Sequence, residues 1–204
     1  INLIVRFYDP TTGRVCINGH DLRTLPVDQV RSLLALVTQD PFLFSGTVKA
    51  NIFPRREAVD PEAFDRVVAA AGCAELIASL PQGGDTPLTE GGALLSSGER
   101  QLLSVARALA RDPQLIILDE ATSYIDSDTE ARLQAAMQRL MTGRTAIIVA
   151  HRLSTARRAD RILVLSRGAV VESGNHDSLM AREGAYARLY RLQGMGPQSD
   201  LEPP

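Results

Sequence analysis

The sequence predicts an α/β fold in which a mostly parallel sheet is covered by helices. Two apolar runs, at 115–118 and 145–152, have the length and composition of buried strands. A helical segment precedes each run, and this alternation is typical of a parallel sheet. Residues from about 41 to 110 carry helical signals and no clear strand, which predicts a helical subdomain there.

Local signals predict the other elements. Residues 1–7 carry apolar side chains at helical spacing and predict the middle of a helix. Further helices are expected after Pro26, over 60–72 between Asp60 and Gly72, over 74–81, from Ser96, over 127–141 and over 177–193. We also expect a turn, strand and turn over 9–19, a strand over 35–39, a Gly-rich loop over 82–93 and a hairpin over 161–174 that turns at Arg167 and Gly168. Residues 194–204 lack the hydrophobicity to pack and are expected to form a disordered tail.

Composition narrows the function classes. The chain of 204 residues has a net charge of −2, which gives no indication of a basic surface for nucleic acid. Its two cysteines, Cys16 and Cys73, lie far apart and form neither a disulfide framework nor a metal-binding spacing, which favours a reducing compartment. No apolar run approaches the roughly 18 residues that a membrane helix needs.

Three predicted strands end in polar residues that are useful in chemistry. Gln39 ends the first, Asp119 and Glu120 follow the second, and His151 ends the third. Open parallel sheets bind ligands at the carboxyl edge, so together these ends predict a ligand site. Each feature alone has a simpler explanation: the histidine as a core or rim residue, the glutamine as incidental, and the acids as caps of the next helix.

Adjacent carboxylates after a buried strand are costly unless a cation compensates their charge. We expect Asp119 to hold Mg²⁺, directly or through water, and Gln39 to supply a neutral oxygen to the metal or the water. Glu120 is then placed to polarise an attacking water as general base, and His151 to hydrogen-bond a terminal phosphate. The implied reaction is phosphoryl transfer to water.

A second constellation lies in the segment LSSGERQLLSVARALA, residues 95–110. Ser96 and Glu99 fit a capping box, and exposed N–H groups beside a hydroxyl and a glycine at a helix start can bind an anion. Spacing alone favours the simpler interpretation, a well-capped helix. Ser127 and Glu130 also fit a capping box, which we interpret as purely structural.

Taken together, these residues resemble the ATP-binding cassette (ABC) family over residues 1 to about 193. LIILDE (115–120) resembles its Walker B strand with the catalytic glutamate, and LSSGERQ (95–101) its signature motif, with Ser97 in place of a glycine and Glu99 in place of a glutamine. SYID (123–126) resembles the D-loop, VTQDPFLFSGTVKANI (37–52) the Q-loop segment of exporters, TEGGA (89–93) the exporter loop that contacts the membrane domain, and IIVAHRLST (147–155) the H-loop.

The resemblance implies a P-loop NTPase fold with a RecA-like core and an inserted helical subdomain. The core would comprise residues 1–40 and 111–193, and the helical subdomain about 41–110. The P-loop motif G-x-x-x-x-G-K-[ST] does not occur in the sequence. We therefore expect the P-loop strand and an N-terminal β-subdomain to be missing, and the chain as given to bind ATP poorly and to be inactive alone.

The resemblance also implies site residues and partners. Two such domains pair head to tail around two ATP molecules, so Ser96, Ser97, Gly98 and Glu99 would contact ATP bound mainly by the second domain, which is either an identical or a different chain. Asp126 would help to align that dimer. The cofactors are ATP and Mg²⁺, with Asp119 and Gln39 as metal ligands and Glu120 and His151 as catalytic residues.

These expectations favour the ATP-hydrolysing motor domain of an ABC exporter. Its Q-loop and the 89–93 loop would transmit domain closure to transmembrane helices, expected upstream in the same polypeptide, at the cytoplasmic face of a membrane. Two alternatives remain at this point: a soluble ABC ATPase of DNA repair or translation, and a non-catalytic regulatory fragment. The exporter-type segments argue against the first, and the presence of Gln39, Asp119, Glu120 and His151 argues against the second.

Overall fold

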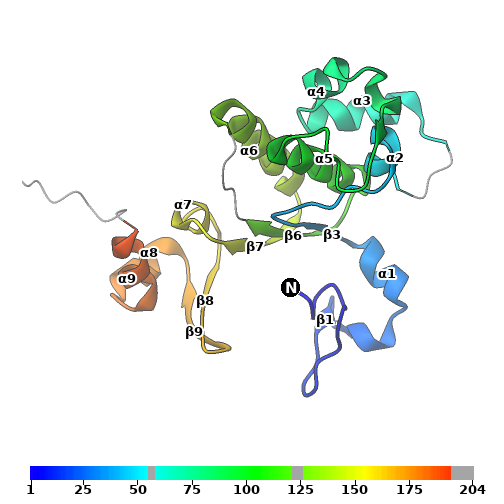
Figure 1. The fold of residues 1–204 in the computed structure, drawn as a ribbon. Coiled ribbons are helices and arrows are strands. Elements are labelled where there is room, and N and C mark those ends of the chain that lie inside the picture. The colour runs from blue at the N-terminus through cyan, green and yellow to red at the C-terminus, as the bar shows by residue number, and fades with distance from the viewer. Residues whose placement is uncertain (55–57, 121–125, 194–204) are drawn as a thin grey trace, which may run out of the picture. The chain divides into compact units, whose positions relative to one another are not determined.

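A computed structural model describes residues 1–54, 58–120 and 126–193, with only the backbone of Glu120 described (Figure 1). The predicted tail, 194–204, lies outside the described residues. The chain divides into two compact units, Ile1–Val149 and Ala150–Pro204. Each unit is described separately.

The sheet of the first unit is built on a parallel strand pair. Strand β3 (Leu34–Val37) pairs with β6 (Leu115–Glu120) in parallel, from Leu34 opposite Leu115 to Val37 opposite Leu118, and β7 (Thr145–Ala150) lies on the other side of β6. The predicted α/β fold with a parallel sheet is therefore confirmed.

The two faces of this strand pair pack against different groups of residues. Alternate side chains of a strand point to opposite faces, and here Ala35, Val37, Ile116 and Leu118 belong to one buried cluster while Leu34 and Ile117 belong to another. Figure 1 shows helices α2–α6 on one side of the sheet, and α1 with the β1 region on the other. Burial on both faces explains why β6 reads as a continuous apolar run.

The helices on the first face include the longest of the unit. They are α2 (Val48–Ile52), α3 (Pro61–Ala70), α4 (Ala74–Ser79), α5 (Ser97–Ala110) and α6 (Ser127–Met141), with a 3₁₀ turn at Gly83–Asp85. The structure adds a two-residue antiparallel pair between β4 (Gly46–Thr47) and β5 (Pro87–Leu88), where the sequence predicted no strand. A strand of two residues is too short to show a periodic pattern, and its partner strand is distant in the sequence.

Helix caps follow the predicted signals at α3 and depart from them at α6. The Asp60 carboxylate accepts bonds from the N–H groups of Glu62 and Ala63, and α3 ends just before Gly72, which has φ +66°. At α6 the N-cap is Asp126, which accepts a bond from Thr129 N at 2.9 Å. The predicted capping box at Ser127 is therefore wrong by one residue.

The predicted N-terminal helix is also wrong. Residues 2–6 form turns, although Ile4 N and Val5 N both donate to Ile1 O as in a helical turn. Arg6 has φ +52°, outside the helical region, and its guanidinium donates to the carbonyls of Leu22 and Leu25. This segment packs on a hairpin of β1 (Cys16–Ile17) and β2 (His20–Asp21), the 3₁₀ turn Leu22–Thr24 and helix α1 (Val27–Ser32).

The second unit contains the predicted hairpin. Strands β8 (Ile162–Ser166) and β9 (Ala169–Gly174) pair antiparallel, and Arg167 and Gly168 turn with φ +50° and +80°. Helix α7 (Leu153–Ala156) precedes the hairpin. The predicted terminal helix is split into α8 (His176–Ala181) and α9 (Ala185–Leu192), because Glu183 has φ +51° and Glu172 accepts the N–H groups of Ala185 and Tyr186.

Within residues 1–54, 58–120 and 126–193, no helix has the length and apolarity needed to cross a membrane.

The two cysteines are expected to react at very different rates. Cys73 has no exposed surface, and burial raises the pKa of its thiol to about 12, whereas Cys16 is exposed. Because the thiolate is the reactive form, a disulfide reagent at pH 8 should titrate one thiol per native chain and two after denaturation. Cys16→Ser should abolish the native reaction. Equal rates for both thiols in the native protein would contradict the buried position of Cys73.

Candidate functional site

The parallel pairing of β3 and β6 brings two of the predicted strand ends to one sheet edge. Val37 lies opposite Leu118; Gln39 follows two residues after Val37, and Asp119 follows Leu118 directly. The Gln39 side chain is exposed and Asp119 is half-buried. The backbone of Glu120 ends β6 at the same edge, and its side chain lies outside the described part of the chain.

Helix α5 holds Gln39 in place through a side chain that sequence reasoning missed. Gln101 Nε2 donates to the main-chain carbonyl of Gln39 at 2.8 Å. Gln101 is only 6% exposed, and its Oε1 is buried with no hydrogen-bond partner among the described residues. No pattern in the sequence pointed to Gln101, because its partner lies 62 residues away along the chain.

The N-terminus of α5 is closed by the predicted capping box. Ser96 Oγ accepts a bond from Glu99 N at 3.3 Å, and Glu99 Oε2 accepts one from Ser96 N at 2.7 Å. Ser96 is exposed, Ser97 half-buried and Gly98 buried. The Glu99 carboxylate is therefore turned back onto its own helix. The 3.3 Å bond from Glu99 N to Ser96 Oγ is the weaker of the two. This geometry matches the simpler interpretation, a well-capped helix.

The two remaining predicted site residues, Asp126 and His151, follow later in the sequence. Asp126 is exposed and caps α6, and bonds from the backbone and hydroxyl of Thr129 lower the pKa of its carboxyl. The rest of the predicted D-loop, 123–125, lies outside the described residues. His151 follows β7 directly, at the start of the second unit, with an exposed side chain.

The segment that follows Gln39 is joined to the 89–93 loop. Gly91 N donates to Leu43 O at 2.9 Å, and a Cβ at Gly92 would lie 2.7 Å from Leu43 Cδ1. On either side of Leu43, Phe42 and Phe44 are about half exposed and pack edge to face with ring centroids 5.0 Å apart. Two segments that the sequence singled out separately thus form one surface with exposed aromatic rings.

Arg107 and Asn51 hold this surface in place through hydrogen bonds to its main chain. Arg107 Nε donates to Asn51 O at 2.7 Å and its Nη1 to Phe42 O at 3.0 Å, while Asn51 bonds both the N–H and the carbonyl of Phe44. Burial lowers the pKa of the Arg107 guanidinium. Neither residue was singled out in the sequence, because their partners lie too far away along the chain for any local pattern.

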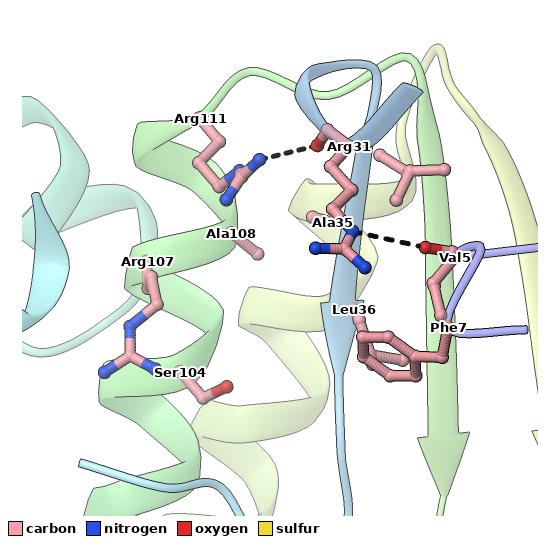
Figure 2. Close-up of a pocket in the computed structure, with 10 residues that line it drawn as sticks. Val5, Phe7, Arg31, Ala35, Leu36, Ser104, Arg107, Ala108 and Arg111 are labelled. Carbon is pink, nitrogen blue, oxygen red and sulfur yellow. Dashed lines mark hydrogen bonds between the residues drawn. The ribbon is translucent and has the colours of Figure 1, made fainter. Parts of the chain in front are cut away.

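A pocket of about 220 Å³ lies at the other end of α5 (Figure 2). Arg31, Arg107 and Arg111 line it, with Phe7 and the side chains of β3; Arg111 Nη2 donates to Arg31 O at 2.6 Å, and Arg31 Nε donates to Val5 O. Arg111 is 14 residues from Ser97, roughly 20 Å along a helix. The pocket thus lies beside β3 and the C-terminal half of α5, away from the capped N-terminus of the helix.

The sheet edge offers oxygen ligands of the kind that Mg²⁺ takes. Magnesium is commonly held by one or two carboxylates together with substrate phosphates and water. Asp119 provides a carboxylate and Gln39 an amide oxygen, and no cluster of three or more His, Cys, Asp or Glu side chains occurs among the described residues. The donor set fits a magnesium ion shared with a phosphate ligand better than a metal held by protein alone.

Comparisons with known proteins agree with the motifs. Residues 1–123 match the sequence model of a family described as ABC transporter. A probable multidrug resistance ABC transporter ATP-binding/permease protein of Bacillus subtilis, YheH, is 48% identical over 193 residues, which cover 95% of this chain and 29% of that protein. An ATP-dependent lipid A-core flippase of Syntrophus aciditrophicus is 46% identical, covering 95% and 32%.

A solved structure shares the fold. The structure of a bacterial Atm1-family ABC exporter with ATP bound aligns with a TM-score of 0.85 and 40% identity, over 94% of this chain and 34% of that one. The chain thus spans about a third of the length of these relatives. The family match covers more than half of the residues, and the motif residues at the sheet edge and at the start of α5 lie within it. The chain therefore belongs to the ABC transporter family.

Proposed function

We propose that this chain is the motor domain of an ABC exporter, which binds and hydrolyses ATP and couples dimer closure to substrate export. The observation that carries the proposal is the parallel pair β3–β6, which delivers Gln39 and the Asp119–Glu120 pair to one sheet edge. The names of the relatives support the exporter class over a soluble ATPase: one is a multidrug resistance transporter, one a flippase, and the solved structure an exporter.

The predicted site residues would divide the chemistry between them. Asp119 and Gln39 would hold Mg²⁺, which when bound neutralises charge on the nucleotide phosphates. Glu120 would accept a proton from the attacking water, and His151 would donate a hydrogen bond to the terminal phosphate. Positioning and charge neutralisation do most of the work in phosphoryl transfer, so the fixed sheet edge matters more than any single reactive group.

The start of α5 would serve a nucleotide held mainly by a second nucleotide-binding domain. In this arrangement Ser96, Ser97 and Gly98 face the nucleotide of the partner, and Asp126 aligns the pair head to tail. A glutamate can be tolerated at position 99 in this arrangement, because its carboxylate already accepts a hydrogen bond from Ser96 N. Residues 1–40 and 111–193 would form the RecA-like core, and about 41–110 the helical subdomain.

The surface with exposed aromatic rings would meet the membrane domain. Phe42 and Phe44 are exposed, and their segment is bonded to the 89–93 loop through Leu43. Exposed aromatic side chains beside a structured loop are typical of protein interfaces. We place this surface against transmembrane helices at the cytoplasmic face of a membrane; the net charge of −2 supports no nucleic-acid partner.

The role of Glu120 is tested by Glu120→Gln in the full-length protein. The amide cannot accept the proton of water, so kcat for ATP hydrolysis should fall at least about 100-fold. ATP binding should persist and trap the closed dimer. Glu62→Gln, an exposed glutamate on α3, is the matched control and should keep the normal rate. Near-normal hydrolysis by Glu120→Gln would exclude the general-base role.

The role of His151 is tested by His151→Ala. Loss of one donor to the developing phosphate charge should lower kcat by roughly 100-fold, as for other such donors. The dissociation constant for ATP should change far less, because the remaining phosphate contacts are retained. The control is His20→Ala, an exposed histidine of β2. An unchanged rate in His151→Ala would contradict the proposed contact.

The charge of Glu99 is tested by comparing Glu99→Gln with Glu99→Ala. A glutamine oxygen can still accept the bond from Ser96 N, so Glu99→Gln should change the free energy of unfolding by no more than about 0.5 kcal/mol. Glu99→Ala loses the capping box and should cost more. Because the capping box holds the carboxylate at Ser96 N, Glu99→Gln should change KM for ATP less than twofold. A large fall in KM in Glu99→Gln would show that the carboxylate of residue 99 faces the nucleotide of the partner.

A further inference from the structure

Two side chains of α5 hold the chain segment that leaves the sheet after β3. Gln101 Nε2 bonds Gln39 O at 2.8 Å, and Arg107 Nη1 bonds Phe42 O at 3.0 Å. Arg107 is further anchored on Asn51 by two bonds of 2.7 and 2.9 Å. The Arg107 end of the contact is thus fixed by several bonds, whereas among the described residues one hydrogen bond holds the Gln101 end.

Stability alone does not account for a glutamine at position 101. The side chain is 6% exposed, and its Oε1 has no partner among the described residues. Exchanging the amide oxygen and nitrogen would set Oε1 against the carbonyl of Gln39, so the orientation is fixed by that contact. A buried acceptor without a partner costs stability. An apolar side chain of the same length would fill the position without that cost.

The contact joins the two parts of the candidate site. Gln101 lies four residues after Ser97, on the same face of α5 and about 6 Å further along the helix. Its partner, Gln39, lies at the carboxyl edge of the sheet beside Asp119. Gln101 bonds the main-chain carbonyl of Gln39. The side-chain amide of Gln39 makes no bond to a described residue. The bond therefore connects the first turns of α5 with the residue that follows β3 at the carboxyl edge of the sheet.

We propose that Gln101 is a positioning residue of the ATPase cycle. Its bond keeps Gln39, at the carboxyl edge of the sheet where Mg²⁺ is proposed to bind, in a fixed position relative to the N-terminus of α5. The inference rests on the proposed function. Without the Gln101 bond, Gln39 samples more positions while the nucleotide keeps its other contacts. The effect therefore falls on kcat for ATP hydrolysis, and the affinity for ATP is nearly unchanged.

The test is Gln101→Met in the full-length protein, because methionine has a similar length and no hydrogen-bonding amide. The substitution removes one bond and one unpaired acceptor, so the melting temperature should stay close to that of the wild type. The kcat should fall about tenfold, the loss expected when one positioning hydrogen bond is removed, and KM should change less than twofold. The matched control is Gln134→Met, an exposed glutamine on α6, which should change neither value.

A double-mutant cycle separates positioning from a general structural effect. Gln39→Ala alone lowers kcat; if Gln101 acts through Gln39, adding Gln101→Met should lower it little further. Fully multiplicative losses would overturn the inference. If Gln101→Met melts early, Gln101→Asn gives a second measurement, because it keeps the amide but is one methylene too short to reach Gln39 O.

The two levels of the proposal fail in different ways. An active wild type with an unchanged kcat in both Gln101 variants would overturn the positioning role and leave the motor function standing. A full-length wild type that hydrolyses no ATP would overturn the proposed function, and the positioning role with it.

Discussion

The parallel pairing of β3 with β6 is the constraint on which the rest of the first unit depends. Both strands are buried on two faces: Ile116 and Leu118 meet the α2–α6 side, and Ile117 the α1 side. A slip of one residue would exchange the side chains that the two clusters receive, so neither cluster would be filled by the residues that fit it. The register that fills both clusters also fixes where Gln39 and Asp119 leave the core.

Helix α5 connects the sheet edge with the candidate anion site at its own N-terminus. Its buried residues include Leu102, Val105 and Ala106, so the helix is anchored along most of its length. Its first turn is closed by its own capping box. The Gln101 bond joins the segment that follows β3 to this helix.

Local signals in the sequence were sufficient for elements that local chemistry determines. The strand at 115–118, the caps of α3 and the turn at Arg167 each depend on residues close in the chain, and all were predicted correctly. The first residues were predicted wrongly, because apolar spacing does not reveal that the Arg6 side chain bonds carbonyls 16 and 19 residues away. The split of the last helix has the same origin.

The candidate site shows the same division. Asp119 and Gln39 could be placed at one edge from the sequence because strand ends are local features and parallel strands share an edge. The link from Gln101 spans 62 residues and that from Arg107 to Phe42 spans 65, so no periodicity or spacing predicts them. Asp126 was predicted to help align the dimer, and the structure shows that its carboxylate caps α6, where the sequence placed the cap at Ser127.

The geometry also answers why two carboxylates follow the most buried strand of the unit. Burial falls from Leu118, at 3% exposed, to the half-buried Asp119 within one residue, so the acids begin where the strand leaves the core. The neighbouring strand contributes a carbonyl that Gln101 already occupies and a side-chain amide that makes no bond to a described residue. The amide of Gln39 is therefore left available at this edge of the sheet, next to the strand that ends in the two acids. In the proposed function, Mg²⁺ bound at this edge would offset the charge of the carboxylates and attract the phosphates of the substrate.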